Sequence, residues 1–417
     1  MQRLAGRGAY QPLAGRSGVL AGLKGILSGP GNQGGFFPIP GLGNLNDGVY
    51  TDFTKGSLTG DRGGTWSLTR ATATTGVDLN GLVYDVSSGA PRWWRIGASS
   101  GAVGISVFGA HTNILLHNRD LTNAAWVKGA TATVAKDQTG ADGTANGASR
   151  ITGGAVTATN AVLQTVVSAS AARYATAWVK RVTGTGTIEM TTDGGTTWVN
   201  VTSQISATYA QITIPVQTVT NPVTGFRITT STDAIAVDYV MNTGVAAAPA
   251  IATTTAAVTV NADVYTLSGS GIINATEGTL YLEALIGAVA NARGLSIDDG
   301  TSNELVEIQN GTIVVTGDTV SANIVDGGVN QAGLASGATG FAGGAAGKIA
   351  VRYKANDFAL SFDGAAAITD TSGTTPAATT FRLSRFNGGN QWSGVIKRVA
   401  YARTGASDAN LAVATTP

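Results

Sequence analysis

Hydrophobic and polar residues alternate with a period of two through much of this 417-residue chain. In residues 174–182, YATAWVKRV, one set of side chains includes Trp178, and the alternate set includes Ala177 and Val179. Such alternation is typical of a β-strand that packs one face against a core. Similar segments follow at short intervals, which predicts an antiparallel sandwich of two sheets. The segments are 162–167, 174–182, 187–191, 197–201, 209–216, 226–230 and 235–241.

A second block of alternating segments starts at about Asp263. In residues 277–284, EGTLYLEA, one face of a strand carries Leu280, Leu282 and Ala284. Residues 347–364 predict two strands about a turn at 355–357, and residues 393–401 predict a final strand, followed at 407–411 by one helical turn. The predicted core faces of the hairpin are Ile349, Val351 and Tyr353 on the first strand and Phe358, Leu360 and Phe362 on the second.

The composition supports an all-β chain. Charged residues make up 12% of the sequence, hydrophobic residues make up 43%, and there are 58 glycines, which suits short strands joined by tight turns. We therefore expect tandem antiparallel β-sandwiches preceded by an extended N-terminal arm. The formal net charge of +1 provides no field that would gather nucleic acid. The chain has no cysteine, which excludes disulfides and thiolate nucleophiles, and its longest apolar tract, 245–260, is too short and polar to span a bilayer.

The first 35 residues form a basic, glycine-rich arm, which we expect to anchor the protein to a partner. Charge is scattered along this arm, whereas a secretory signal keeps its charge ahead of an unbroken apolar core. Apolar residues at 19, 20, 23, 26 and 27 fall on one helical face, but glycines at 18, 22 and 25 each weaken a helix by about 1 kcal/mol. We favour an arm that orders on a partner surface over a free amphipathic helix or a disordered tail. The expected anchoring residues are Arg3, Arg7, Arg16 and Lys24.

The least generic stretch is 108–126, FGAHTNILLHNRDLTNAAW. Read locally, it predicts a buried strand leading into a loop that opens the first β block. It also resembles a cassette of tailed-bacteriophage virion proteins, in which E-G-A-R-T-N-L-L is followed by N-S-E-D-F-x-N-A-A-W. His111 stands where that cassette has Arg, and Arg119 stands where it has a small or acidic residue, so salt bridges at those positions do not transfer directly. The matching residues are Gly109, Ala110, Thr112, Asn113, Leu115, Leu116, Asn118, Asn123, Ala124, Ala125 and Trp126.

Shorter phrases on both sides continue this resemblance. The phrases D-F-T-K-G at 52–56, T-R-A-T-A-T at 69–74 and A-P-R at 90–92 are similar to phrases upstream of the cassette, and 253–263 is similar to the connector T-T-G-A-A-V-T-R-A-A-D. The block after Trp126 resembles jelly-roll modules related to carbohydrate-binding domains, and the block from Asp263 resembles laminin-G-like or concanavalin-like lectin sandwiches. The expected units are an anchoring arm at 1–35, a β-rich docking and linker region at 36–110, a jelly-roll domain at 111–250 and a lectin-like domain at 251–417.

Tryptophans are the candidate glycan-binding residues, because an indole offers a pyranose ring a broad apolar face and a polar edge. Trp198 follows the sequence Asp193-Gly194-Gly195, which suits a hairpin turn with positive φ. Trp94 lies in R-W-W-R at 92–95, where neighbouring strand residues point to opposite faces, so one of the two tryptophans is expected in the core. Trp392 is the third candidate. For Trp94 and Trp198, packing against the core is the alternative.

No residue pattern predicts an enzyme or a cofactor site. The spacing of the two histidines, His111 and His117, without a nearby third ligand is a weak metal signal. The sequence contains no phosphate-binding or dinucleotide-binding fingerprint. Asp298, Asp299, Glu304 and Glu307 provide carboxylates for glycoside hydrolysis, and Asp298 and Asp299 with Asn303 provide oxygens for Ca²⁺, yet a solvated β-turn has the same residues. We interpret the chain as a non-enzyme.

The resemblance implies a structural protein of a bacteriophage virion. In that interpretation the chain is a fibre or spike that its arm anchors to other virion proteins, a homo-oligomer with trimers favoured, and its sandwiches meet host-surface glycans. A capsid decoration or head-fibre protein without a receptor role is the first alternative. A polysaccharide depolymerase spike would need a regular β-helix period that the sequence does not show. A secreted bacterial lectin is disfavoured because no signal peptide is evident.

Overall fold

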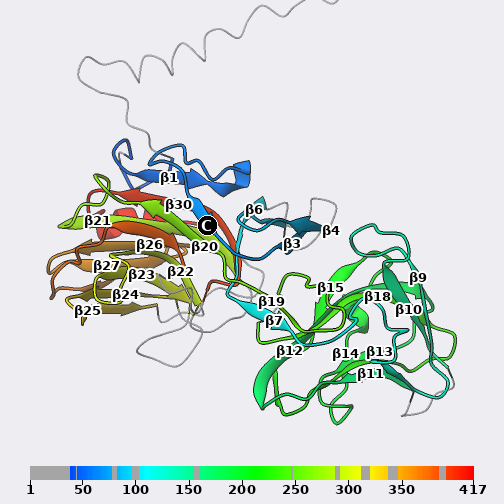
Figure 1. Cartoon of the computed structure of the whole chain (residues 1–417). Helices are drawn as coiled ribbons and strands as arrows, with labels where there is room; N and C mark the ends of the chain where they lie inside the picture. The colour runs from blue at the N-terminus through cyan, green and yellow to red at the C-terminus, as the bar shows by residue number, and fades with distance from the viewer. Residues whose placement is uncertain are drawn as a thin grey trace, which may run out of the picture.

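The computed structural model describes residues 38–43, 45–77, 82–95, 103–154, 160–245, 248–286, 292–310, 320–336, 346–384 and 391–417. Strands dominate these residues, and the strand pairs of the sheets are antiparallel, so the prediction of an all-β chain is confirmed. The strands form two sandwiches that lie side by side, which we call the middle sandwich and the C-terminal sandwich (Figure 1).

The C-terminal sandwich packs an eight-stranded sheet against a seven-stranded sheet. Its core contains the predicted inward faces of the 347–364 hairpin, among them Ile349, Tyr353 and Phe358. The eight-stranded sheet runs β28 (Ile368–Asp370), β27 (Phe358–Phe362), β26 (Ala346–Lys354), β21 (Glu277–Ile286), β30 (Gly394–Ala402), β6 (Val103–Val107) and β5 (Trp93–Arg95), with β1 (Val49–Asp52) also paired to β30. The seven-stranded sheet runs β2 (Ser67–Thr69), β20 (Val264–Ser268), β29 (Thr380–Leu383), β22 (Ala292–Asp298), β23 (Leu305–Asn310), β24 (Val320–Asp326) and β25 (Val329–Ala335).

The strands of the C-terminal sandwich come from two separate parts of the chain. Before the cassette, β1, β5 and β6 join the eight-stranded sheet, and β2 pairs with β20 in the seven-stranded sheet. The region expected as a docking and linker unit at 36–110 therefore supplies strands to the same sandwich as the C-terminal block. The middle sandwich is an insertion between β6 and β20.

The middle sandwich packs a six-stranded sheet against a five-stranded sheet. Ala177 and Val179, from one of the two alternating sets in 174–182, lie in its core together with Trp126 of the cassette, and Trp178 of the other set is buried in a separate cluster. The six-stranded sheet runs β15 (Ala210–Thr213), β12 (Ala171–Thr183), β18 (Ala234–Thr243), β10 (Ala148–Thr152) and β9 (Thr133–Gln138), with β16 (Gln217–Val219) also paired to β12. The five-stranded sheet runs β14 (Val199–Asn200), β13 (Ile188–Thr191), β17 (Val223–Ile228), β11 (Ala161–Thr165) and β8 (Val127–Lys128). A 3₁₀ turn, η2 (Thr202–Gln204), follows β14.

Two short antiparallel strand pairs lie beside the sandwiches. β7 (His111–Asn113) leads into the insertion and pairs with β19 (Val258–Val260), which leads out of it, so the two connecting segments form one ladder between the sandwiches (Figure 1). β3 (Thr74–Val77) pairs with β4 (Val83–Val86). The Thr75 hydroxyl donates a hydrogen bond to the Ala250 carbonyl at 2.8 Å. This bond links the hairpin to the segment between β18 and β19, which leads the chain back to the C-terminal sandwich and which we call the returning segment.

The first described residues and the C-terminal helix pack together against the eight-stranded sheet. Ile39, Leu42 and Leu45 share a buried cluster with Leu411 of α2 (Asp408–Thr415). The helix is longer than the single turn expected from the sequence, and it begins after Ser407, whose side chain caps it. A 3₁₀ turn, η1 (Phe53–Lys55), follows β1. The segment that carries Ile39, Leu42 and Leu45 therefore belongs to the folded C-terminal sandwich.

Candidate functional site

A buried ion triad lies where the inserted middle sandwich joins the C-terminal sandwich. Asp263, just before β20, accepts hydrogen bonds from Arg70 Nη1 at 2.6 Å and from Arg92 Nη2 at 3.0 Å. The backbone N–H of Phe108 also donates to Asp263, at 3.0 Å. The three charged side chains are fully buried. They come from T-R-A-T-A-T, A-P-R and the connector, and Phe108 opens the cassette, so the phrases that carry the virion-protein resemblance meet at one joint.

Two asparagines of the cassette hold the other end of the ladder that β7 and β19 form. Asn113 Nδ2 donates to the carbonyl of Val240 at 3.1 Å and to that of Ile251 at 3.4 Å. Asn118 Nδ2 donates to the Ile251 carbonyl at 2.7 Å, and Asn118 Oδ1 accepts from the Thr253 N–H at 2.8 Å. Both asparagine side chains are fully buried. They therefore provide hydrogen-bond partners for buried backbone groups of β18 and of the segment between β18 and β19.

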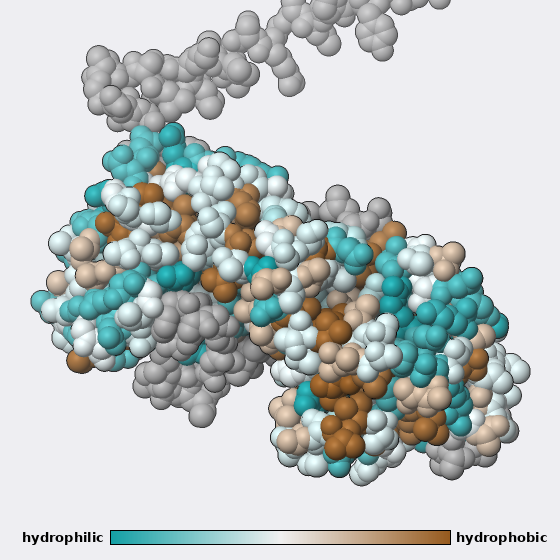
Figure 2. All heavy atoms as spheres, in the orientation of Figure 1, coloured by the Kyte–Doolittle hydropathy of each residue, from teal (hydrophilic) through white to brown (hydrophobic). Residues whose placement is uncertain are grey.

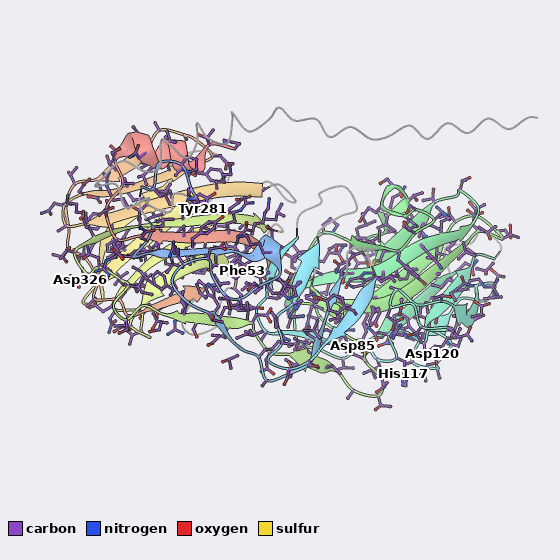
Figure 3. The ribbon with its side chains drawn as sticks, turned by 90° about the horizontal axis from the view of Figure 1, so that it is seen from above. Phe53, Asp85, His117, Asp120, Tyr281 and Asp326 are labelled. Carbon is purple, nitrogen blue, oxygen red and sulfur yellow. The ribbon has the colours of Figure 1, made fainter. Side chains whose placement is uncertain are left out.

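The structure shows what the two departures from the cassette do. His111 is buried, and its Nδ1 lies 2.8 Å from the Gly109 carbonyl oxygen; burial lowers the pKa of His111 to about 4. Arg119 makes ion pairs of its own, from Nε to Asp238 at 2.7 Å and from Nη1 to Asp142 at 2.8 Å. Figure 3 labels His117 and Asp120, which lie in the same loop as Arg119, on the side of the middle sandwich. The cassette thus has a structural role, in agreement with its local interpretation.

Trp198 lies beside the predicted hairpin turn of the five-stranded sheet. Gly194 and Gly195 adopt φ values of +76° and +91°, which confirms the expected positive φ. Asp193 Oδ1 accepts a hydrogen bond from the Thr197 N–H at 2.9 Å, which fixes the turn. A Cβ at position 195 would lie 2.6 Å from Trp198 Nε1, so the indole packs closely on a glycine. Trp198 remains half-buried and therefore presents part of its ring at the surface.

A row of polar side chains continues this surface across three strands. Glu189 on β13 lies directly opposite Arg227 on β17 and Asn200 on β14. Arg227 Nε and Nη2 lie 2.7 and 2.6 Å from Glu189 Oε2, and the guanidinium carbon lies 4.5 Å from the centroid of the Trp198 ring. The side chains of Arg227 and Glu189 are 21% and 16% exposed. We call Trp198, Arg227, Glu189 and Asn200 the Trp198 face.

Apolar side chains extend the same sheet surface beyond the polar row. Leu163 on β11 pairs with Val127 on β8, and the Val127 side chain is 68% exposed. Figure 2 shows hydrophobic residues exposed on the middle sandwich.

Sequence reasoning identified Trp198 but missed Arg227 and Glu189. The alternation in E-M-T at 189–191 and F-R-I at 226–228 marks both as outward residues, but the strand register that brings them together is not visible in the sequence.

The other predicted site residues do not join this face. Trp392 was a candidate for glycan binding, and this prediction is wrong in the structure, because its side chain is fully buried in the core of the C-terminal sandwich. It packs on Gly294, where a Cβ would lie 2.8 Å from Trp392 Cε3. The Trp94 side chain lies outside the described residues. The anchoring residues Arg3, Arg7, Arg16 and Lys24 lie outside them as well.

The carboxylates around the 299–304 turn serve structural contacts. Both oxygens of Asp298 accept hydrogen bonds from Arg382 Nε, at 2.8 and 2.9 Å. Asp299 accepts from the backbone and hydroxyl of Thr301, as in an Asx turn. The Ca²⁺ set of Asp298, Asp299 and Asn303 thus has a buried, arginine-paired member. No group of three or more acidic or histidine side chains in the described residues is placed to hold a metal ion, and no described helix is long and apolar enough to cross a membrane.

No protein-family model matches this chain. No curated protein matches it either. Among solved structures, it is similar to the CBM40 of Ruminococcus gnavus IT-sialidase bound to alpha2,3 sialyllactose, with 18% identity and a TM-score of 0.28 over 34% of this chain and 84% of that chain. It is also similar to the NanB sialidase from Streptococcus pneumoniae, with 11% identity and a TM-score of 0.29 over 35% of this chain and 26% of that chain. Galectin-Ib of Xenopus laevis gives 12% identity and a TM-score of 0.23 over 31% and 96% of the two chains. These likenesses are too weak to carry an argument about function.

Proposed function

We propose that this chain is an adhesive protein of a virion surface, which binds host-surface glycans through the Trp198 face and attaches to the particle through its N-terminal arm. The observation that carries the glycan part is the half-buried indole of Trp198 on the Arg227–Glu189 pair. We further propose that the protein acts as a homo-oligomer, with a trimer as the favoured state.

The Trp198 face has the groups that a sugar needs. An indole gives the apolar face of a pyranose ring a flat contact, and each sugar hydroxyl needs both a donor and an acceptor. Arg227 and Asn200 supply N–H donors, while Glu189 and Asn200 supply oxygens. The Glu189 carboxylate holds the guanidinium of Arg227 in place, so few side-chain rotations have to be frozen on binding.

The virion part rests on the phrases of the resemblance. Arg70, Arg92, Phe108 and Asp263 come from four such phrases and meet at the buried joint, which supports the phrases as parts of one structural unit. The arm is separate from this unit in sequence, and its positive charges make it a candidate for attachment to other virion proteins. The chain would then sit on the particle surface with its sandwiches outward.

The test is binding of the purified oligomer to surface polysaccharide from a susceptible host, with Trp198→Ala as the main variant. We expect Trp198→Ala to weaken binding about 5- to 30-fold, because stacking of one ring on an aromatic contributes on the order of 1–2 kcal/mol. Arg227→Lys keeps the charge but loses the planar fork and should also weaken binding. Tyr174→Ala, which removes a half-buried aromatic from β12, is the matched control and should bind as the unchanged protein does.

The outcomes separate the alternatives. Binding that leaves the polysaccharide mass unchanged supports adhesion, whereas shortened polysaccharide would favour a depolymerase. Absence of binding in the unchanged protein would favour a decoration protein without a receptor role. A large drop in Tm for Trp198→Ala, with unchanged binding, would assign the indole to packing.

A further inference from the structure

A second row of residues lies beside the polar row of the Trp198 face, two residues further along the strands and therefore about 7 Å away. Met190, Phe226 and Val162, which alternate with this row, lie in the core, so the row itself is on the outer face of the sheet. In the register of the strands, the row, which we call the apolar row, consists of Thr191 on β13, Gly225 on β17, Leu163 on β11 and Val127 on β8. Trp198, one residue before β14, continues it beyond Thr191, because the next residue, Val199, is opposite Met190.

The apolar row offers a ligand carbon atoms and few hydrogen-bonding groups. The Thr191 hydroxyl accepts from the Gly195 N–H at 3.0 Å and donates to Asp193 at 2.8 Å, so it is committed to the turn that carries Trp198. Gly225 has no side chain, and a Cβ there would overlap the carbonyl oxygen of Val162. The sheet is therefore flat between the indole of Trp198 and the side chain of Leu163.

The apolar row is open to solvent at the end away from Trp198. The Val127 side chain is 68% exposed, and Leu163 opposite it is partly exposed. The ammonium group of the neighbouring Lys128 donates to the carbonyls of Thr122 and Asn123, at 2.8 and 2.6 Å, which holds its charge on the cassette. A ligand on the Trp198 face can therefore reach Val127 and Leu163 without any movement of the backbone.

The size of the apolar row excludes a large protein partner as its main occupant. A stable protein interface buries about 800 Å² on each side around an apolar centre. The row instead is one residue wide, and Glu189 and Arg227 of the polar row border it. Its width fits a small apolar group that is part of a mostly polar ligand.

The polar row sets the charge of that ligand. Arg227 and Glu189 pair at 2.7 Å, so their formal charges cancel and favour a neutral molecule. Arg227 has five N–H donors, and its Nε and Nη2 contact Glu189, whereas Nη1 makes no hydrogen bond among the described residues. A neutral sugar with an acetyl group matches both rows, because its methyl is apolar and its carbonyl oxygen accepts a hydrogen bond.

We propose that the sugar bound by the Trp198 face carries an acetyl group, whose methyl packs on Leu163 and Val127. In this arrangement the pyranose ring stacks on Trp198 and the acetyl carbonyl oxygen accepts a hydrogen bond from Arg227. The inference rests on the proposed glycan binding and adds the class of ligand. N-acetylated and O-acetylated sugars share this chemistry, whereas a plain hexose leaves Leu163 and Val127 in water.

The test measures binding of the full chain to a printed array of matched neutral pairs. One arm sets each N-acetylhexosamine oligosaccharide beside its hexose analogue, such as chitotetraose beside cellotetraose, and the other sets each O-acetylated oligosaccharide beside its alkali-treated form. The best-retained pair is then titrated by calorimetry. The variant is Val127→Thr with Leu163→Thr, since threonine suits a strand and exchanges apolar surface for a hydroxyl. Val329→Thr, at a 62% exposed valine on β25, is the matched control.

We expect the acetylated member of a pair to bind about fourfold more tightly or better, which is the effect of burying one methyl group. The double variant should lose this preference and keep its affinity for the unacetylated member. Trp198→Ala should weaken both members by a similar factor, and Val329→Thr should change neither. If the double variant fails to fold, Val127→Thr alone, at an exposed position, should still reduce the preference.

Equal binding of the two members by the unchanged chain would overturn the proposal, and so would a preference that survives in the double variant or retention of no acetylated oligosaccharide. Dissociation of the oligomer in the double variant would overturn it by assigning the apolar row to a contact between subunits. The host polysaccharide judges the proposed function separately. Binding that depends on Trp198 but is unchanged after removal of acetyl groups would keep the proposed function and refute this inference alone.

Discussion

Replacement of Asp263 by asparagine is the most direct test of the joint at the root of the insertion. Asp263 faces two fully buried guanidinium groups, on Arg70 and Arg92, and accepts the N–H of Phe108. Asparagine has nearly the same shape, but it removes the negative charge and one of the two oxygen acceptors. The variant therefore leaves two buried cations without a carboxylate partner among the described residues.

The expected cost follows from this geometry. Removal of one partner from a buried ion pair costs about 3–5 kcal/mol, because the remaining charge stays out of water. The asparagine oxygen keeps one of the hydrogen bonds, which returns about 1 kcal/mol. With two cations affected, we expect Asp263→Asn to lower the unfolding free energy of the C-terminal sandwich by about 4 kcal/mol, a large part of the 5–15 kcal/mol typical of a domain.

The assay is equilibrium unfolding in urea, followed by tryptophan fluorescence and circular dichroism so that separate transitions of the two sandwiches are resolved. Asp137→Asn breaks a partly exposed pair with Arg150 and should cost less than about 1 kcal/mol. The triple variant Arg70→Met, Arg92→Met, Asp263→Leu should recover only part of the lost stability. It removes the buried charges, but it also takes away the hydrogen bonds that Arg70 donates to the carbonyls of Thr72, Ser87 and Ala90 and the acceptor of the Phe108 N–H. A loss below about 1 kcal/mol in Asp263→Asn would refute the reasoning.

Two further predictions concern the arm and His111. Deletion of residues 1–35 should leave Tm unchanged and abolish the proposed attachment to a virion particle, whereas deletion to residue 46 should lower Tm, because it removes the buried Ile39, Leu42 and Leu45; an unfolded 1–35 deletion would contradict the arm model. His111 has its pKa lowered from 6.5 to about 4, mainly by burial, with Arg92 also opposing the proton and Asp263 and the Gly109 carbonyl favouring it. Between these values the unfolded chain binds more protons than the folded one, so stability falls as the pH is lowered, by about 2 kcal/mol from pH 7.5 to pH 5. Urea unfolding at the two pH values should show this loss in the unchanged chain and a smaller one in His111→Gln; equal losses would exclude His111 as the cause.

The strands and their faces were predictable because alternation is a local property. The hairpin at 347–364 places its predicted residues in the core, the segment at 174–182 forms a strand as expected, and the turn at Gly194 and Gly195 has the expected φ. Each of these features depends on residues within a few positions of one another. Side-chain direction in a strand follows from its period of two, so the hydrophobic pattern is sufficient to predict it.

The insertion and the polar row depend on pairings between distant residues. Phe108 and Asp263 are 155 positions apart and meet through two hydrogen bonds, one from the Phe108 N–H to the Asp263 carboxylate and one from the Asp263 N–H to the Phe108 carbonyl. Glu189 and Arg227 are 38 positions apart, and their proximity requires the register of β13 and β17. A shift of one residue in that register would turn Arg227 into the core. The burial of Trp392 likewise depends on a space above Gly294 that no local pattern reveals.

The way the insertion is held to the C-terminal sandwich bears on how the Trp198 faces of an oligomer would work together. The ladder of β7 and β19 is held at one end by Asp263 and at the other by Asn113 and Asn118, so both connecting segments are fixed at both ends. In the proposed oligomer, a polysaccharide that occupies the Trp198 face of one subunit would then meet the Trp198 face of another subunit at a limited set of distances, not through a freely jointed linker. The second contact becomes intramolecular, and its gain is greatest when the repeat of the polysaccharide matches the spacing of the two faces. Loosening the joint, as in Asp263→Asn, should therefore weaken binding of long polysaccharide more than binding of a single short oligosaccharide.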